Sequence, residues 1–81
     1  MKPLVTLYTR QRCCLCDDAK AVIAAARDRA EFDYEERDID RDSELVRLYN
    51  DDVPVIAIDG VKAFKHKVNM KEFLKKLAAR A

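Results

Sequence analysis

Glycine, proline and tryptophan are scarce in this sequence of 81 residues, which has one glycine, two prolines and no tryptophan. It also has no internal repeat and no low-complexity tract, so it has no candidate linker between domains. Its length provides for one modest hydrophobic core. We therefore predict a single domain over residues 1–81.

The sequence lacks a strong excess of charge of either sign, and its formal net charge is +1. Nucleic-acid binding usually requires a basic excess, so we expect no nucleic-acid partner. No apolar run is long enough to cross a bilayer, and residues 1–3 lead directly into a strand pattern without the apolar core of a signal peptide. These absences predict a cytoplasmic protein with no membrane partner.

Three cysteines lie within four positions, as Cys13, Cys14 and Cys16. Cysteines this close together cannot link distant elements, so they exclude a disulfide framework. In a small protein of a reducing compartment, a reactive or metal-binding pair is favoured instead.

Cys13 stands at the boundary between two predicted elements. Residues 3–8 are β-branched and aromatic enough to predict a buried strand, and helical spacing follows from Cys14 to Ala30. The free N–H groups and positive dipole end of a helix N-terminus lower the pKa of a thiol there. Arg10 and Arg12 add positive charge on the approach loop, which acts in the same direction.

Cys16 follows Cys13 by about one helical turn, so the two sulfur atoms can lie close together. Attack by one thiolate on a disulfide makes a mixed disulfide, and the neighbouring thiol resolves it. We predict that Cys13 is the exposed nucleophile and that Cys16, on the inner side of the helix, is the resolving thiol. Cys14 is interpreted as a bystander or a site of side oxidation.

The rest of the sequence predicts a strand-helix-strand unit joined to a hairpin and a last helix. Charged residues suit residues 31–40 to an edge strand. The turn signal Asp59-Gly60 joins two further strands. The remaining expected elements are a short helix capped by Asp42 or Ser43 that ends before residues 50–52, an apolar strand over residues 53–58, a strand over residues 62–68, and a helix capped by Asn69.

Apolar spacing also predicts which side chains face inward. The expected inner residues are Leu45, Leu48 and Tyr49 in the short helix, Phe64, His66 and Val68 on one face of the last strand, and Met70, Phe73, Leu74, Leu77 and Ala81 in the last helix. A right-handed strand-helix-strand unit joined to a hairpin gives a four-stranded mixed sheet of the α/β class, with three helices packed on both faces.

Several short motifs occur in an order that is typical of one family. They are Leu7-Tyr8-Thr9-Arg10 before Cys13-Cys14-Leu15-Cys16, Val53-Pro54-Val55 at the third strand, and Ile58-Asp59-Gly60 at the hairpin. With them, nearly the whole sequence resembles the glutaredoxins of the thioredoxin superfamily. The Leu15-Cys16 ending and the run from Asp38-Ile39-Asp40 to Val53-Pro54 are similar to a small glutaredoxin-like subfamily. The resemblance implies a thioredoxin-like fold with strand order 2-1-3-4.

The resemblance also implies a function, a thiol-disulfide oxidoreductase that reduces protein or small-molecule disulfides through a Cys13–Cys16 disulfide. Pro54 is expected to be a cis proline that leaves the backbone of Val53 exposed to an extended thiol peptide. Arg10 stands where many glutaredoxins have a lysine that meets a glutathione carboxylate. We therefore assign substrate contacts to Arg10, Leu15, Val53 and Pro54.

One departure from the glutaredoxin pattern concerns glutathione. Glutaredoxins usually carry two glycines and then an acidic residue after the hairpin, whereas this sequence has Phe64, Lys65, His66 and Lys67 there. Bulky side chains obstruct a ligand that must approach the backbone. Glutathione could serve as reductant, although its usual contacts are partly missing, and no bound cofactor is expected. The expected partners are a disulfide-bearing protein or a small thiol, and the expected state is a monomer.

Two other interpretations of the cysteines remain open. A zinc site from the three thiols and His66 is disfavoured, because structural zinc usually uses two separated pairs of ligands, so we assign no metal. An iron-sulfur cluster shared between two chains is a family-level alternative. The second functional hypothesis is a non-catalytic module that uses the same surface to bind a thiol peptide, a partner protein or a metal.

Overall fold

The computed structural model describes residues 2–80, so Met1 and the predicted inward Ala81 lie outside the described residues. The elements in order are β1 (Leu4–Thr9), α1 (Cys14–Ala26), β2 (Asp33–Asp38), the 3₁₀ helix η1 (Ile39–Arg41), α2 (Ser43–Tyr49), β3 (Val55–Ile58), β4 (Val61–Lys65) and α3 (Met70–Ala78). In the described part of the chain, none of the helices is both long and apolar enough to span a membrane.

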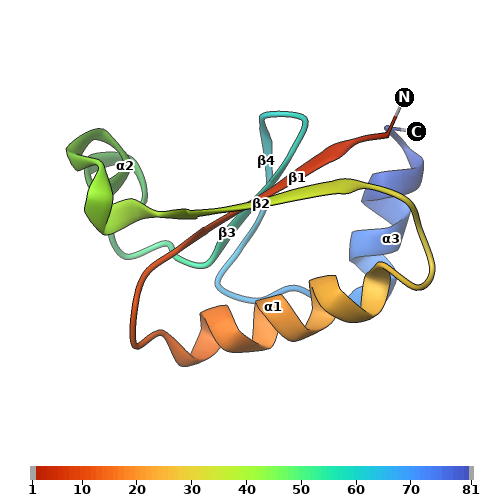
Figure 1. Cartoon of the computed structure of the whole chain (residues 1–81), viewed down its shortest axis with the longest axis horizontal. Coiled ribbons are helices and arrows are strands. Elements are labelled where there is room, and N and C mark those ends of the chain that lie inside the picture. Colours follow the sequence, from red (N-terminus) through yellow and green to blue (C-terminus); the bar gives the residue numbers. More distant parts are fainter. Residues whose placement is uncertain (1, 81) are drawn as a thin grey trace.

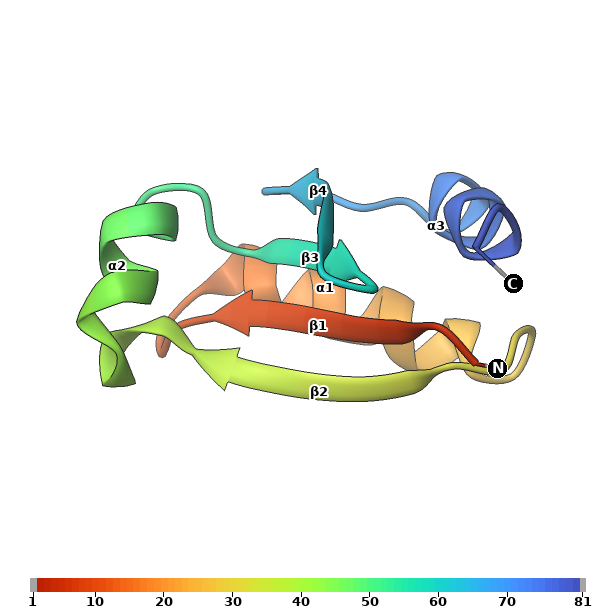
Figure 2. The same cartoon turned by 90° about the horizontal axis from the view of Figure 1, so that it is seen from above.

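The four strands form one mixed sheet in the order β2-β1-β3-β4 (Figures 1 and 2). β1 pairs in parallel with β2 and antiparallel with β3, and β4 pairs antiparallel with β3. This topology confirms the predicted strand order. The charged strand β2 lies at an edge, where carboxylates discourage pairing with another molecule.

The core lies on the face of the sheet that α1 and α3 cover (Figure 1). Side chains alternate along a strand, so Val5 and Leu7 of β1 point to one face, and the register places Ile58 and Ile56 of β3 beside them. Phe73 of α3 is fully buried against this layer. The apolar strands β1 and β3 therefore form the surface on which α1 and α3 pack.

The opposite face of the sheet is covered at one end only. α2 lies beyond the ends of β1 and β2 (Figure 2), and the ring of its Tyr49 packs on Tyr8 with 4.6 Å between centroids. Farther along this face, the Thr6 hydroxyl donates a hydrogen bond to Glu35 at 3.0 Å. Helices thus pack on both faces of the sheet, and the second face carries polar side chains such as Thr6 and Glu35.

α1 is shorter than the sequence pattern predicts, because it ends at Ala26 and not at Ala30. The following N–H groups of Arg27, Asp28 and Arg29 donate to carbonyls three residues earlier, at 2.9 to 3.3 Å. Such bonds tighten the last turn and end the α-helix. Alanine and charged residues continue the helical pattern past this point, so the pattern alone overestimates the length.

β4 ends at Lys65, so the predicted strand over residues 62–68 is too long. Phe64 pairs with Ile56 and Lys62 pairs with Ala57, which leaves Ala63 as an extra residue that breaks the alternation. His66 then has a left-handed backbone, with φ of 65°, and its side chain is exposed. The predicted common face of Phe64, His66 and Val68 is therefore wrong.

Local turn and cap signals agree with the structure. Asp59 and Gly60 have φ of 51° and 82°, which suits a tight hairpin turn. Asn69 caps α3 by accepting a hydrogen bond from the N–H of Glu72 at 2.8 Å. Asp42 caps α2.

The predicted inner face of α2 is only partly correct. Leu45 and Tyr49 are half-buried, whereas Leu48 is 52% exposed. Val46 is half-buried in its place. The reason is that α2 packs at the end of the sheet and not flat on its face.

Candidate active site

The loop between β1 and α1 turns the chain so that Cys13 becomes the N-cap of α1. Arg12 has a left-handed backbone with φ of 59°, and Cys13 is extended, with φ of −112° and ψ of 104°. The sulfur of Cys13 accepts a hydrogen bond from the N–H of Cys16 at 3.2 Å. A sulfur in this position accepts a hydrogen bond from the first turn of the helix and lies at the positive end of the helix dipole. Both interactions favour a thiolate.

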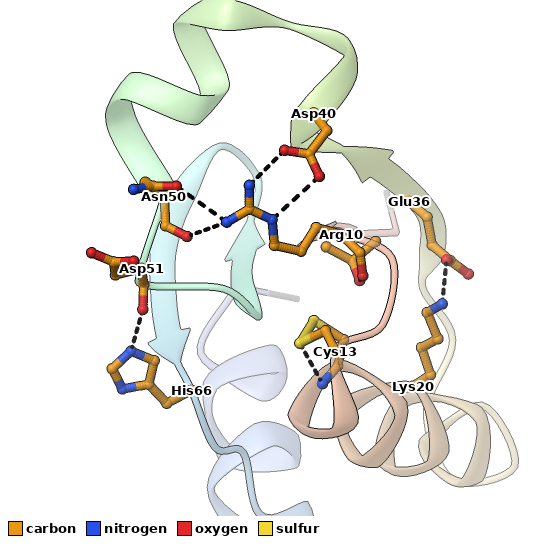
Figure 3. The surroundings of a disulfide bond; sticks show 10 residues. Arg10, Cys13, Lys20, Glu36, Asp40, Asn50, Asp51 and His66 are labelled. Carbon is orange, nitrogen blue, oxygen red and sulfur yellow. Dashed lines mark hydrogen bonds and ion pairs between the residues drawn. A yellow bond between two sulfur atoms is a disulfide. The ribbon is translucent and has the colours of Figure 1, made fainter.

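The structure brings Cys13 and Cys16 together. Figure 3 shows Cys13 and the surroundings of this disulfide. Their sulfur atoms lie at disulfide distance, and their Cα atoms are 5.2 Å apart. Cys13 is half-buried, whereas Cys16 is 1% exposed. Cys14 is an exposed free thiol outside the pair. Solvent therefore reaches one sulfur of the pair much more readily than the other.

Val53 and Pro54 lie at the same end of the sheet as the cysteine loop. Tyr8 pairs with Val55, so Pro54 enters β3 beside the point where β1 leaves the sheet for Cys13. The Val53–Pro54 peptide bond is cis. Val53 is half-buried and Pro54 is buried.

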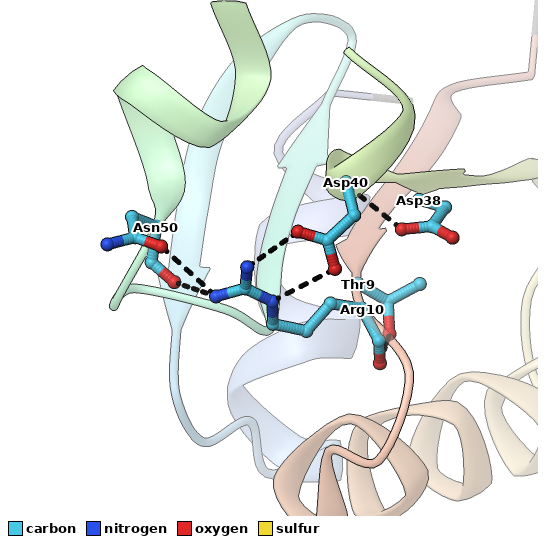
Figure 4. Close-up of polar contacts among 5 residues, drawn as sticks. All are labelled: Thr9, Arg10, Asp38, Asp40 and Asn50. Carbon is cyan, nitrogen blue, oxygen red and sulfur yellow. Dashed lines mark hydrogen bonds and ion pairs between the residues drawn. The ribbon is translucent and has the colours of Figure 1, made fainter. Parts of the chain in front are cut away.

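Arg10 is held by the protein itself (Figure 4). Its Nη2 and Nε donate to the two carboxylate oxygens of Asp40 at 2.6 and 3.2 Å. Its Nη1 donates to the carbonyl oxygen and the side-chain oxygen of Asn50 at 3.0 and 3.1 Å. The hydrogen bond from Arg10 holds the pKa of the Asp40 carboxyl below its ordinary value, and the same bond raises the pKa of Arg10.

Sequence reasoning did not assign Asp40 and Asn50 to the site. Asp40 belongs to η1, and Asn50 is the C-cap of α2. The available signal was their position in the run from Asp38-Ile39-Asp40 to Val53-Pro54, which the resemblance had singled out. Nothing in that run indicates which arginine they contact.

His66 lies on the other side of the Val53–Pro54 segment. Its Nε2 lies 3.0 Å from the carbonyl oxygen of Asp51, and its backbone N–H donates to the carbonyl oxygen of Pro54 at 2.8 Å. Within residues 2–80, no three His, Cys, Asp or Glu side chains are grouped so that they could hold a metal ion.

Leu15 borders a small groove at the start of α1. The side chain of Leu15 is 37% exposed. The groove has a volume of about 260 Å³ and is lined by Leu15, Asp18, Ala19, His66, Lys67 and Val68. It lies between the first turns of α1 and the segment between β4 and α3, and its lining combines apolar side chains with charges of both signs.

The sheet order and the adjacent cysteines at a helix N-terminus define a glutaredoxin-like protein of the thioredoxin superfamily. Comparison with known families agrees with this class. The glutaredoxin-like domain family (DUF836) matches residues 4–78, and the chain belongs to this family. The family resemblance predicted from the sequence is confirmed.

Solved structures show the same fold. An NMR structure of a protein from Nitrosomonas europaea is 25% identical, with a TM-score of 0.83 and coverage of 95% of this chain and 93% of that chain. An X-ray structure of a structural-genomics target from X. campestris is 31% identical, with a TM-score of 0.77 and coverage of 93% and 96%. A thioredoxin mutant from Halobacterium salinarum is 13% identical, with a TM-score of 0.73 and coverage of 96% and 74%, and this likeness concerns the fold alone.

Proposed function

We propose that this protein is a thiol-disulfide oxidoreductase that reduces disulfides of proteins or small molecules in a reducing compartment. One observation carries the proposal. A half-buried Cys13 at the N-cap of α1 lies within disulfide distance of the buried Cys16. This arrangement supplies an accessible nucleophile with a stabilised thiolate and a second thiol that is protected from competing reactions.

The reaction begins with both cysteines reduced. The Cys13 thiolate attacks one sulfur of the substrate disulfide, a Cys13–substrate bond forms, and the other substrate sulfur leaves as a thiolate and takes up a proton. Cys16 then loses its proton and attacks the Cys13 sulfur, which releases the second substrate thiol. Two electrons pass from the cysteine pair to the substrate, and an external thiol or dithiol must reduce the pair again.

Val53, Pro54 and Leu15 are proposed to contact the substrate. The segment before β3 lies at the sheet end from which the cysteine loop departs, so an extended peptide could pair with the Val53 backbone while its cysteine meets Cys13. The groove beside Leu15 would take a neighbouring side chain of that peptide. No bound cofactor is needed for this chemistry.

Three serine variants test the assignment of roles. Cys13→Ser should lower insulin reduction with dithiothreitol as donor to the rate of dithiothreitol alone, because the attacking sulfur is gone. Cys16→Ser should trap a mixed disulfide, visible as added mass on the intact protein. Cys14→Ser is the matched control and should keep the rate of the unchanged protein. Wild-type activity in Cys13→Ser would contradict the proposal.

A non-catalytic binding module is the alternative. The partly missing glutathione contacts favour it, because Phe64 and Lys65 stand where glutaredoxins carry the glycines that meet glutathione. A protein that is silent in both insulin reduction and reduction of a glutathione mixed disulfide, but that binds a thiol peptide tightly, would support this alternative.

A further inference from the structure

Arg10 connects two loops whose relative position matters for the proposed function. It lies three residues before Cys13, and its partner Asn50 lies three residues before Val53. Four hydrogen bonds, at 2.6 to 3.2 Å, use four of the five N–H groups of the guanidinium. Figure 4 shows the side chain spanning from one loop to the other, with Asn50 at its far end and Asp40 above the guanidinium.

We propose that Arg10 is a positioning residue, which fixes the loop that carries Cys13 relative to the segment that carries Val53 and Pro54, and that it does not bind substrate. This inference rests on the proposed function and specifies how its two parts are aligned. The planar guanidinium suits the role, because a carboxylate fork on one edge and two acceptors on another fix its orientation. An ammonium group has no such geometry.

The segment from Asn50 to Pro54 is held on its other side by His66. The imidazole contacts the carbonyl of Asp51, and the backbone N–H of His66 contacts the carbonyl of Pro54. Arg10 and His66 thus hold this segment from opposite sides, as Figure 3 shows for the side chains. Among residues 2–80, Arg10 is the side chain of the cysteine loop that hydrogen-bonds to this segment, so the loss of Arg10 contacts should change the spacing of the two parts.

The relation between the loops matters most for an extended substrate. A peptide disulfide must pair with the backbone of Val53 and present its sulfur to Cys13 at the same time, and small misplacements are costly in such arrangements. A small disulfide without a peptide backbone, such as 2-hydroxyethyl disulfide, needs only Cys13. The substrate favoured by a fixed spacing is therefore a protein or peptide disulfide.

The test uses Arg10→Lys and Asp40→Asn, with Lys20→Gln as the control. Lys20 forms another ion pair, with its Nζ 3.4 Å from a carboxylate oxygen of Glu36, and its ion pair does not involve residues 50–54. Pre-reduced protein is mixed with a disulfide-bridged peptide, and the rate of its oxidation is followed against peptide concentration. Both variants should raise the half-saturating concentration by about tenfold and keep the maximal rate within about twofold.

Two comparisons distinguish a positioning role of Arg10 from an effect of its charge and from a role in ligand binding. Arg10→Lys keeps the positive charge, so the thiol pKa of Cys13 and the rate with 2-hydroxyethyl disulfide should stay unchanged. Asp40→Asn removes the carboxylate partner of the Arg10 guanidinium. If Arg10 bound a ligand carboxylate, this variant should have a lower half-saturating concentration of glutathione disulfide. A lower half-saturating concentration of glutathione disulfide in Asp40→Asn, or unchanged use of the peptide in both variants, would overturn the proposal.

Hydrogen exchange tests the positioning without turnover. In Asp40→Asn, amides of residues 10–13 and 50–53 should both exchange faster, because the same side chain restrains both segments. Lys20→Gln should leave both segments unchanged. Faster exchange in only one segment would contradict the link. An inactive wild-type protein with this coupled exchange would overturn the proposed oxidoreductase but not the link between the loops.

Discussion

The face of the sheet under α1 and α3 and the end of the sheet beside Cys13 are built from different interactions. On the face, Leu7, Ile56 and Phe73 are at most 1% exposed, and their apolar side chains belong to one core cluster. At the end, Arg10, Asp40 and Asn50 make directional hydrogen bonds that are open to solvent. The same small domain therefore combines a buried apolar layer with a solvent-exposed group of hydrogen bonds.

The two regions should contribute differently to stability and to function. Burial of apolar surface is non-directional and supplies most of the folding free energy. Solvent-exposed ion pairs add little to stability, but bidentate hydrogen bonds set orientation. Changes on the face should therefore alter the free energy of unfolding, whereas changes at the end should alter alignment of the cysteine pair with the segment before β3.

The largest effect is expected for Phe73→Ala. Phe73 is fully buried and contacts Phe32 edge-on, with 5.7 Å between ring centroids. Truncation should lower the free energy of unfolding by about 3–5 kcal/mol, measured by urea denaturation, through lost burial and an unfilled cavity. Phe73→Leu removes less volume and should lose less.

The same variants test the separation of the two regions. Under conditions in which they stay folded, the thiol pKa of Cys13 and the rate of oxidation by a disulfide-bridged peptide should match the unchanged protein. A shifted thiol pKa in Phe73→Leu would show that the apolar layer also sets the geometry of the site, and the comparison would then fail.

A smaller effect on the free energy of unfolding, which should stay unchanged or rise, is expected for Tyr34→Phe. Tyr34 packs against the apolar layer, and its buried hydroxyl has no hydrogen-bond partner among residues 2–80. Burial raises the pKa of this hydroxyl, with Glu36 adding to the effect. Removal of an unpaired polar group should leave stability unchanged or raise it by about 1 kcal/mol. A clear loss of stability on denaturation would mean that the hydroxyl has a partner in solution.

The parts of the fold that follow from local signals are predictable from the sequence. The apolar runs of β1 and β3, the Asp59-Gly60 turn and the Asn69 cap each depend on neighbouring residues, and each is present. The end of β4 does not follow in this way. The extra residue Ala63 is defined only by how β4 pairs with β3, and no spacing within the strand indicates it.

The candidate site also has one part that the sequence predicts and one part that it does not. The proximity of Cys13 and Cys16 follows from a spacing of one helical turn, so the sequence predicts it. The contacts of Arg10 do not follow, because Asp40 and Asn50 lie 30 and 40 residues further along the chain. A lone arginine beside a reactive cysteine is equally compatible with a ligand contact, and only the fold shows which acceptors surround it.

The smallest effect, on stability in acid, concerns the polar end. Because Arg10 donates to Asp40, the pKa of this carboxyl is lower in the folded protein than its ordinary value of 3.8. A carboxyl with a depressed pKa stabilises the fold above its unfolded pKa, and that contribution is lost as the pH falls through the folded pKa. The stability of the wild-type protein should therefore decrease more steeply below pH 3.8 than that of Asp40→Asn. The measurement is urea denaturation from pH 6 to pH 2 for both proteins at constant ionic strength, and parallel curves would show that the pair contributes to alignment of the loops but not to stability.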